Sequence, residues 1–416
     1  MQFFKAKTLS IYTKNILIMF KGTFIAQVIA IIGAIYLAKL YGQTVYGYFG
    51  VFVSFSGIFS IINTLQLDNN IVTLKNKNNS NHWTSFLFLI TIIISVLLIC
   101  FFYLIDFFYN FDLIQKNIIV LAIISAFFLA NILILERTFT FYEKFKYLSY
   151  GKIILSLTNV TFQYVLYKYF SLKGLMFGML ISQFTLIAFY FFYGPNFRKK
   201  INFKLIKRDF KNNTSIIKYL LPSNLINTLA INLMPILIFL YFDANEAAVY
   251  FLSLKILTTP LHLISSSIAN VYFQKSSELF QLSNKKLLQL TKQTVKANFV
   301  FMLLFILLIN TFGICFLEII FDKSWNNLRL TTLILSFLIL ARSTFNPISS
   351  IIVVSKKNHV SLYFNIYLLI INFLAVYIGY LNNSIFYAII ALSFLGGIGY
   401  LLLLKYFLNL LKIKNV

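Results

Sequence analysis

The chain has 416 residues, of which 60% are hydrophobic and 11% are charged. Soluble domains are about 45–50% apolar and about 25% charged, and disordered chains are less apolar still, so the composition excludes both classes. The formal net charge is +25, from 36 Lys and Arg against 11 Asp and Glu; in so apolar a chain this excess indicates the cytoplasmic loops of a membrane protein rather than a nucleic-acid-binding protein.

Apolar runs long enough to cross a bilayer follow one another along the whole chain. A transmembrane helix needs about 20 residues, and an open sheet would leave backbone groups unsatisfied in lipid. We therefore predict an all-α integral membrane protein with about 12 transmembrane helices. The predicted spans are 15–38, 45–67, 84–109, 117–135, 151–169, 172–194, 216–241, 246–272, 296–320, 329–354, 360–380 and 385–408. The first run, from Ile16, continues as a full span without a small-residue cleavage site, so we expect no signal peptide.

The basic residues determine the predicted orientation. If the N-terminus is cytoplasmic, 28 of the 36 Lys and Arg fall in inside segments and 6 fall outside, while Lys255 and Arg342 lie within spans. Because cytoplasmic loops carry the excess of Lys and Arg, we place both termini in the cytoplasm. An odd number of spans would destroy this asymmetry, which supports an even number.

The longest connection, 195–215, is also the most basic one. It divides the chain into a predicted N-terminal six-helix bundle, 1–205, and a predicted C-terminal six-helix bundle, 206–416. A faint internal repeat supports two pseudo-symmetric halves. Tyr46-Gly47-Tyr48-Phe49 opens span two, and Ala248-Val249-Tyr250-Phe251 opens span eight, 202 residues later. Duplicated halves are common in transporters, where the substrate site lies at their interface.

Polar side chains recur within several spans at the spacing of one helix face. Span eight carries Lys255, Thr258, Thr259, His262 and Ser266; the other positions are Lys21 and Gln27 in span one, Asn63 in span two, Asn224, Asn227 and Asn232 in span seven, and Arg342 in span ten. Residues at i, i+3, i+4 and i+7 share a face, and ionisable or amide groups inside a membrane tend to face a cavity or a partner. The alternative is that Ser, Thr and Asn bond neighbouring helices together.

The ionisable residues within spans have alternatives of their own. Lys255 lies about 13 Å inside its span, and it either faces a cavity or snorkels to the surface. Arg342 lies near the middle of its span, where it faces a water-filled cavity or pairs with a buried carbonyl group. Lys21 is close enough to the inner surface to be an anchor, and His262 is either a proton sensor or a neutral, hydrogen-bonded histidine.

Acidic residues are absent from the deep part of every predicted span, because Asp68, Asp106, Glu136 and Glu318 lie near span ends. Buried cations without buried carboxylates suit an anionic substrate and not an organic cation. The sequence has no Gly-x-x-x-x-Gly-Lys-Ser/Thr motif, no metal-spaced His and Cys cluster and no nucleophile elbow. We expect no ATP use, no catalytic residue, no metal and no cofactor.

Two stretches of the sequence resemble a known family. The first includes Lys21-Gly22-Thr23, Gln27, Tyr41-Gly42, Tyr46-Gly47-Tyr48-Phe49 and Leu65-Gln66-Leu67-Asp68; the second includes Tyr219-Leu220-Leu221-Pro222, Val249-Tyr250-Phe251, Pro260 and Ser267. They are similar to motifs of the Wzx-type oligosaccharide flippases, in the polysaccharide biosynthesis family of the multidrug/oligosaccharidyl-lipid/polysaccharide exporter superfamily. Many members carry an Asp-Arg pair late in span seven. This chain has Asn232-Leu233-Met234-Pro235 there, so the role of that pair does not carry over.

The resemblance implies a multi-pass protein of the bacterial cytoplasmic membrane. Such a protein flips undecaprenyl-diphosphate-linked oligosaccharides to the outer leaflet by alternating access, for synthesis of O-antigen or another surface polysaccharide. Spans one, two, seven and eight would line its cavity. The expected diphosphate-binding residues are Lys255, Lys21 and Arg342, and the expected sugar-binding or cavity-lining residues are Gln27, Asn63, Asn224, Asn227, Asn232, Thr258, Thr259 and His262. Expected partners are the lipid-linked oligosaccharide, anionic lipids and other polysaccharide assembly proteins, with no nucleic acid and a monomeric chain.

Three other functions are open at this point. A membrane glycan polymerase or ligase resembles this chain in its number of spans, but it would have a long external loop with arginines. Here the predicted external loops are short and Arg329 is their only arginine. A multidrug or cation exporter of the same superfamily would normally have a buried carboxylate. A lipid II flippase is closer in chemistry, but such proteins resemble fourteen-span chains.

Overall fold

The computed structural model describes residues 2–74, 77–170, 173–194, 221–321, 325–355 and 357–413. Over these ranges the chain forms helices joined by short turns, and they contain no strand. The predicted linker 195–215, and with it the predicted boundary between residues 205 and 206, lies outside the described residues.

The chain divides into two compact units. Unit 1 comprises Met1–Leu37 and Tyr48–Thr228, and unit 2 comprises Ala38–Gly47 and Leu229–Val416. The division between the units therefore falls near residue 228, and the short segment 38–47 groups with the C-terminal part of the chain. The boundary at 205 stays a prediction.

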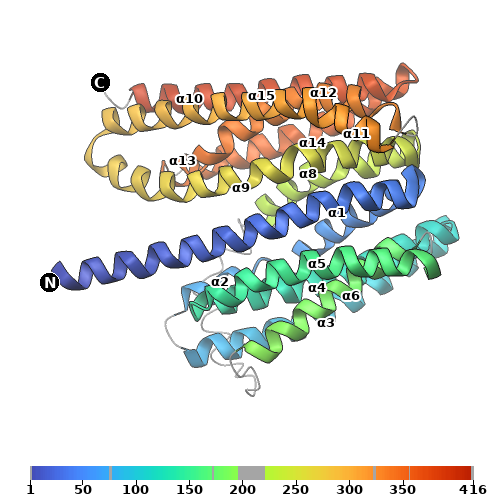
Figure 1. Cartoon of the computed structure of the whole chain (residues 1–416), viewed down its shortest axis with the longest axis horizontal. Helices are drawn as coiled ribbons and strands as arrows, with labels where there is room; N and C mark the ends of the chain where they lie inside the picture. The colour runs from blue at the N-terminus through green and yellow to red at the C-terminus, as the bar shows by residue number, and fades with distance from the viewer. Residues whose placement is uncertain are drawn as a thin grey trace. The chain divides into compact units, whose positions relative to one another are not determined.

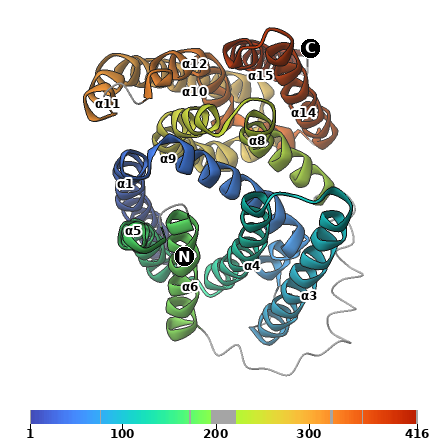
Figure 2. The same cartoon turned by 90° about the vertical axis from the view of Figure 1, so that its right-hand side faces the viewer.

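Unit 1 is built on long helices (Figure 1). They are α1 (Gln2–Thr64), α3 (Lys77–Tyr109), α4 (Leu113–Phe141), α5 (Phe145–Phe170) and α6 (Gly174–Tyr193), with the short α2 (Asn69–Thr73) between the first two. Gly42 interrupts α1, because its φ of 76° and ψ of 170° are not helical. Glycine adopts such angles without the steric cost of a β-carbon, so α1 contains two crossings. In Figure 2, α5 lies beside α6 and α3 lies beside α4, and α4 also contacts α5 and α6.

Unit 2 begins within α8 and continues to the C-terminus. Its helices are α8 (Leu221–Tyr241), α9 (Ala244–Leu282), α10 (Asn284–Leu308), the π-helical turn η3 (Ile309–Gly313), α11 (Ile314–Phe321), α12 (Leu328–Phe345), the 3₁₀ turn η5 (Asn346–Ile348), α13 (Ile351–Val354), α14 (Asn358–Leu381) and α15 (Ile385–Ile413). α12 and α14 both pack against α15, and α9 packs against α10 and α12. Buried residues such as Leu257, Leu335 and Ile389 form the core between these helices.

The helices account for the predicted number of spans. Among the described residues, nine continuous helical runs are long and apolar enough to cross a membrane, and Leu17–Thr64 is counted as one of them. That run contains the two crossings of α1. α5 and α9 are also long enough, with 26 and 39 residues, but are more polar. The chain is therefore a multi-pass all-α membrane protein, and the prediction of about twelve helices, six in each half, is confirmed.

Several helix ends differ from the predicted ones. Predicted span two runs to residue 67, but α1 ends at Thr64 because Leu65 and Gln66 have positive φ angles of 49° and 57°. Predicted span ten is one helix, but the structure interrupts it at Asn346–Ile348, where Pro347 lies in a 3₁₀ turn. Proline lacks an amide hydrogen and cannot continue the hydrogen-bond ladder there.

The segment 38–47 is anchored on the N-terminal end of α9. Thr44 Oγ1 lies 2.7 Å from Asn245 Oδ1. The Tyr46 ring, which is 1% exposed, lies 5.8 Å from the Phe251 ring and 6.0 Å from the Trp325 ring. The two copies of the faint repeat thus contact each other through Tyr46 and Phe251.

Candidate functional site

A polar cluster follows the second crossing of α1, where the Leu65-Gln66-Leu67-Asp68 motif forms a tight turn. The backbone N–H of Gln66 donates to Thr64 Oγ1 at 3.2 Å, which holds the turn at the end of the helix. Leu67 is 1% exposed and packs in an apolar cluster with Trp83 and Ile134. The motif therefore fixes the end of α1 against α3 and α4.

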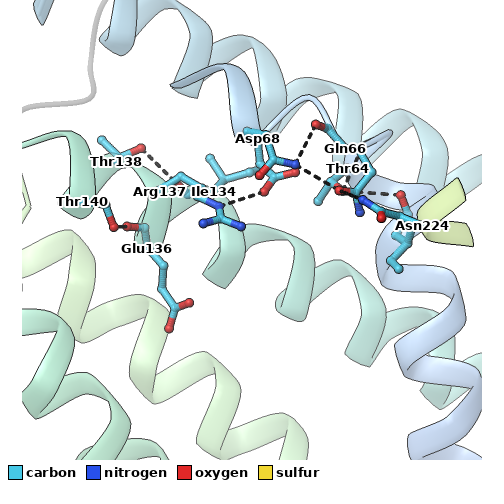
Figure 3. Close-up of polar contacts among 11 residues, drawn as sticks. Thr64, Gln66, Asp68, Ile134, Glu136, Arg137, Thr138, Thr140 and Asn224 are labelled. Carbon is cyan, nitrogen blue, oxygen red and sulfur yellow. Dashed lines mark hydrogen bonds and ion pairs between the residues drawn. The ribbon is translucent and has the colours of Figure 1, made fainter. Parts of the chain in front are cut away.

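Asp68 forms an ion pair with Arg137 of α4. Arg137 Nε donates to Asp68 Oδ2 at 3.3 Å, and the two side chains are 44% and 5% exposed, respectively. Burial raises the pKa of the Asp68 carboxyl group, and the Arg137 guanidinium opposes that rise. A carboxylate this well buried requires a cation, so the pair links the turn to α4 (Figure 3).

The Gln66 side chain joins the beginning of α8 to the same turn. Its Oε1 atom accepts a hydrogen bond from Asn224 Nδ2 at 3.0 Å and another from Asn69 Nδ2 at 3.0 Å (Figure 3). Asn224, which we expect to contact sugar, therefore uses its amide group on a neighbouring turn in this structure. Its predicted role in binding is not tested by this contact.

Polar pairs between helices are frequent in unit 1. Ser95 Oγ donates to Asn63 Oδ1 at 3.1 Å, and Asn63 is fully buried. Gln183 Nε2 of α6 donates to Ser125 Oγ of α4 at 3.0 Å. Such contacts are typical of the bonds that hold membrane helices together. They support the packing alternative for Asn63.

The sequence analysis missed a polar stripe on α5. Its members are Ser149, Lys152, Ser156, Asn159 and Gln163, at alternating spacings of three and four residues. Lys152 Nζ donates to Thr23 Oγ1 of α1 at 3.0 Å, and Gln163 Nε2 donates to the Leu175 carbonyl of α6 at 2.8 Å. The helical spacing was a readable signal. Four of its five members lie within the predicted span 151–169, and α5 itself begins at Phe145.

The remaining predicted residues of unit 1 lie on α1 and α8. Lys21 is exposed, and Gln27 is half-buried with no hydrogen-bond partner for its Oε1 atom among the described residues. Asn227 is half-buried on α8. Asn232, on the same helix, belongs to unit 2. The predicted polar face of span seven is therefore shared between the units.

In unit 2, Lys255 lies on α9 with Thr258 and Thr259 one turn further on. The Lys255 ammonium lies 5.9 Å from the centre of the Phe251 ring and the residue is half-buried. Thr258 Oγ1 donates to the Leu254 carbonyl at 2.7 Å. Both Thr258 and Thr259 are half-buried. The side chain of His262 lies outside the described part of α9. The predicted stripe therefore does lie on one helix.

Arg342 lies on α12, at a different depth from Lys255. Thr332 Oγ1 of α12 donates to Ser253 Oγ of α9 at 3.1 Å. α9 also contacts η5 and α13, which follow α12 in the chain, so α9 and α12 run in the same direction. At 1.5 Å per residue, Arg342 then lies about 12 Å further along the bundle than Lys255. Neither forms an ion pair with a described acidic residue. The structure thus places two separate cations in unit 2.

The comparisons agree with this arrangement of helices. The family described as polysaccharide biosynthesis protein matches residues 36–329. No curated protein matches the sequence. An inward-facing multidrug resistance MATE transporter of the MOP superfamily is 14% identical with a TM-score of 0.66, covering 95% of this chain and 96% of its own. The lipid II flippase MurJ, in an inward closed conformation, is 14% identical with a TM-score of 0.72, and the match covers 94% of this chain and 87% of the MurJ chain.

A third similar structure is a MOP superfamily transporter from Pyrococcus furiosus. It is 12% identical with a TM-score of 0.57, and the match covers 96% of each chain. At these identities the likeness shows the fold alone, whereas the family match covers most of the sequence. The predicted family is confirmed: this chain belongs to the polysaccharide biosynthesis protein family and has the fold of the MOP-superfamily transporters.

Proposed function

We propose that this protein is a flippase, which moves an undecaprenyl-diphosphate-linked oligosaccharide from the inner to the outer leaflet of a bacterial cytoplasmic membrane. Family membership supports a role in polysaccharide synthesis, and the fold supports transport. MurJ, whose structure is similar, is described as a lipid II flippase. The product would serve synthesis of O-antigen or another surface polysaccharide.

The observation that carries this proposal is the pair of membrane cations in unit 2. Lys255 and Arg342 have no ion-pair partner among the described acidic residues, and a cation inside a membrane is costly unless a charge or cavity compensates it. A diphosphate is a suitable anion for either cation. Lys21 would add a third cation, and Gln27, Asn227, Asn232 and Thr259 would contact sugar hydroxyl groups. The chain would work as a monomer beside anionic lipids and other assembly proteins.

The membrane potential can drive this movement. Moving one charge across 100 mV corresponds to about 2.3 kcal/mol. A diphosphate with about two negative charges would gain roughly 4–5 kcal/mol per 100 mV on leaving a negative interior. The lysine and arginine side chains would lessen this gain to the extent that they move with the anion.

The experiment is replacement of Lys255 in cells that depend on this protein for their surface glycan. We expect K255A to reduce the glycan at equal protein level and K255R to restore most of it. K168A is the matched control, because Lys168 is exposed in the last turn of α5. Wild-type glycan in K255A would remove Lys255 from the mechanism. Normal glycan after deletion of the gene, together with increased drug sensitivity, would favour a multidrug exporter.

A further inference from the structure

Pro347 frees one backbone carbonyl group at the end of α12. In an α-helix each carbonyl accepts a hydrogen bond from the N–H four residues later. The Asn346 N–H bonds the Arg342 carbonyl, but the next pair would join residue 347 to Ser343, and proline has no N–H. Ser343 is 6% exposed. A buried carbonyl requires a partner, so a donor from outside the helix ladder is needed there.

Asn298 of α10 supplies that donor. Its Nδ2 atom donates to the Ser343 carbonyl oxygen at 2.7 Å, and the residue is 2% exposed. Its Oδ1 atom has no partner within the described residues, so the bond to Ser343 is what ties this buried amide to α12. The Asn298 side chain thus replaces the N–H that Pro347 lacks.

This contact lies directly beside Arg342. Predicted span ten, 329–354, has Arg342 near its middle, but α12 ends at Phe345, so Arg342 lies in the last turn of the helix. Phe345 packs in an apolar cluster with Leu287 of α10. The backbone around Arg342 is therefore held against α10 by apolar packing and by the bond between Asn298 and Ser343.

The exposed face of α10 changes character at Asn298. Lys292 and Lys296, which precede it, are exposed, and so are the apolar residues Phe299 and Val300, which follow it. Lipid covers exposed apolar side chains and water covers exposed lysines, so the edge of the hydrocarbon layer crosses α10 close to Asn298. The beginning of α10 is predicted to be cytoplasmic, which assigns this edge to the inner leaflet.

α15 places the edge at the same level. Leu402 is 59% exposed and Lys405, almost one turn later, is exposed as well. The Tyr400 ring, just before them, lies 6.3 Å from the Phe345 ring at the end of α12. Arg342 lies about 5 Å before Phe345 along the helix. The diphosphate of an inner-leaflet lipid lies in the headgroup layer directly outside this edge, and a long arginine side chain reaches such a layer.

We propose that Asn298 is a positioning residue for Arg342, the cation that binds the diphosphate of the substrate at the inner leaflet. Asn298 does not touch the ligand. By holding the Ser343 carbonyl it keeps the interrupted end of α12, and with it the Arg342 backbone, in one place. An arginine on a fixed helix end loses less conformational entropy on binding an anion than one on a loose end. This inference rests on the proposed function, because it takes the lipid diphosphate as the ligand of Arg342.

Pro347 provides a test that separates positioning from ordinary packing. In P347A, residue 347 has an N–H that bonds the Ser343 carbonyl through the helix ladder, so the Asn298 amide is no longer needed. N298L should therefore weaken ligand binding when residue 347 is proline and have little effect when it is alanine. If Asn298 only fills space or joins two helices, the loss in N298L is the same in both backgrounds.

The experiment is calorimetric titration of the purified full chain in detergent with farnesyl diphosphate. We expect R342M and N298L each to weaken binding by about tenfold, and N298L/R342M to bind no more weakly than R342M, because both changes remove one interaction. P347A and N298L/P347A should bind within about threefold of wild type. N310L is the matched control, because Asn310 Nδ2 also bonds α12, at Ser336 Oγ and 2.8 Å, and it should leave binding unchanged.

Several results would overturn the inference. They are wild-type affinity in N298L, additive losses in N298L/R342M, an N298L loss that P347A does not reduce, or a P347A variant that binds as weakly as N298L. Inorganic pyrophosphate should bind more weakly than farnesyl diphosphate, and equal binding of the two would count against a lipid as the source of the anion. Monodispersity on size exclusion verifies folding, and N298A, which adds no bulk, replaces N298L if that variant aggregates.

Failure of this inference is separable from failure of the proposed function. Wild type without affinity for farnesyl diphosphate would reject the diphosphate as the ligand, and both proposals with it. Wild-type affinity in R342M, together with a loss in K255A, would keep the flippase and reject the role of Arg342. A loss in R342M without a loss in N298L would reject the positioning role of Asn298 alone.

Discussion

The α-carbon of Gly47 faces the carbonyl oxygen of Ala244 so closely that a β-carbon at position 47 would overlap that oxygen. Backbone atoms of α9 cannot move aside as a side chain can. The contact places the segment 38–47 on the end of α9, together with the Tyr46 and Phe251 rings. Glycine at this position is therefore required by close approach and not by its dihedral angles.

The first prediction is that G47A separates this segment from α9. Overpacking at a rigid contact costs about 1–3 kcal/mol, and G47V should cost more because the added atoms meet the same oxygen. The readout is thermal unfolding followed by tryptophan fluorescence, since Trp325 lies 6.0 Å from Tyr46. G313A is the control, because the nearest atoms to its added β-carbon are 3.7 Å away. A melting temperature of G47A equal to that of G313A would contradict the reading.

The second prediction concerns Gly42, which contrasts with Gly47. A β-carbon at position 42 meets nothing within 4 Å, but φ is +76°. The penalty of a substitution is then backbone strain of about 1–3 kcal/mol, which does not grow with side-chain size. G42A and G42L should lower the melting temperature by similar amounts. A much larger loss in G42L would show that space, and not the dihedral angle, sets the requirement.

The overall fold could be predicted because lipid imposes it. Twenty-residue apolar runs and the distribution of lysine and arginine are properties of the sequence alone, and they led to twelve helices. Helix ends are less predictable: α4 continues to Phe141, beyond the predicted end at residue 135, and α5 begins at Phe145, before the predicted start at residue 151. The end of an apolar run marks where lipid contact ends, and a helix can continue past it.

The candidate site was only partly predictable for a related reason. The stripe Lys255, Thr258 and Thr259 follows from spacing on one helix, and α9 contains it. The pairing of Asp68 with Arg137, and the depth of Arg342 relative to Lys255, depend on the register between helices far apart in sequence. Periodicity within a helix carries no information about that register.

The third prediction tests the orientation. Lys285 lies at the start of α10 and is predicted to be cytoplasmic, whereas Asn382 follows α14 and is predicted to be external; both are exposed. In a background without the two native cysteines, an impermeant maleimide added to intact cells should label N382C and leave K285C unlabelled. Permeabilised cells should show labelling of both. The reverse pattern in intact cells would invert the predicted topology.

The fourth prediction follows from the unequal burial of Asp68 and Arg137. Removing Arg137 leaves a buried carboxylate without a cation, so R137M should lose about 1–3 kcal/mol at pH 8, less than a fully buried pair because Arg137 is 44% exposed. D68N should lose less, since the arginine it leaves behind reaches solvent. The double variant D68N/R137M should recover part of the loss.

The same pair predicts a pH dependence of defined sign. Burial raises the pKa of Asp68, and loss of Arg137 removes the interaction that opposes this rise. A carboxyl group whose folded pKa lies above its unfolded value of about 3.9 destabilises the fold above the folded pKa, and stability returns as the pH falls through it. The difference in melting temperature between wild type and R137M should therefore shrink from pH 8 to pH 5. The melting temperature of D68N/R137M should change less over that range than that of R137M, because the double variant lacks the titrating carboxyl group. A constant difference between wild type and R137M would show that the arginine acts through packing and not through charge.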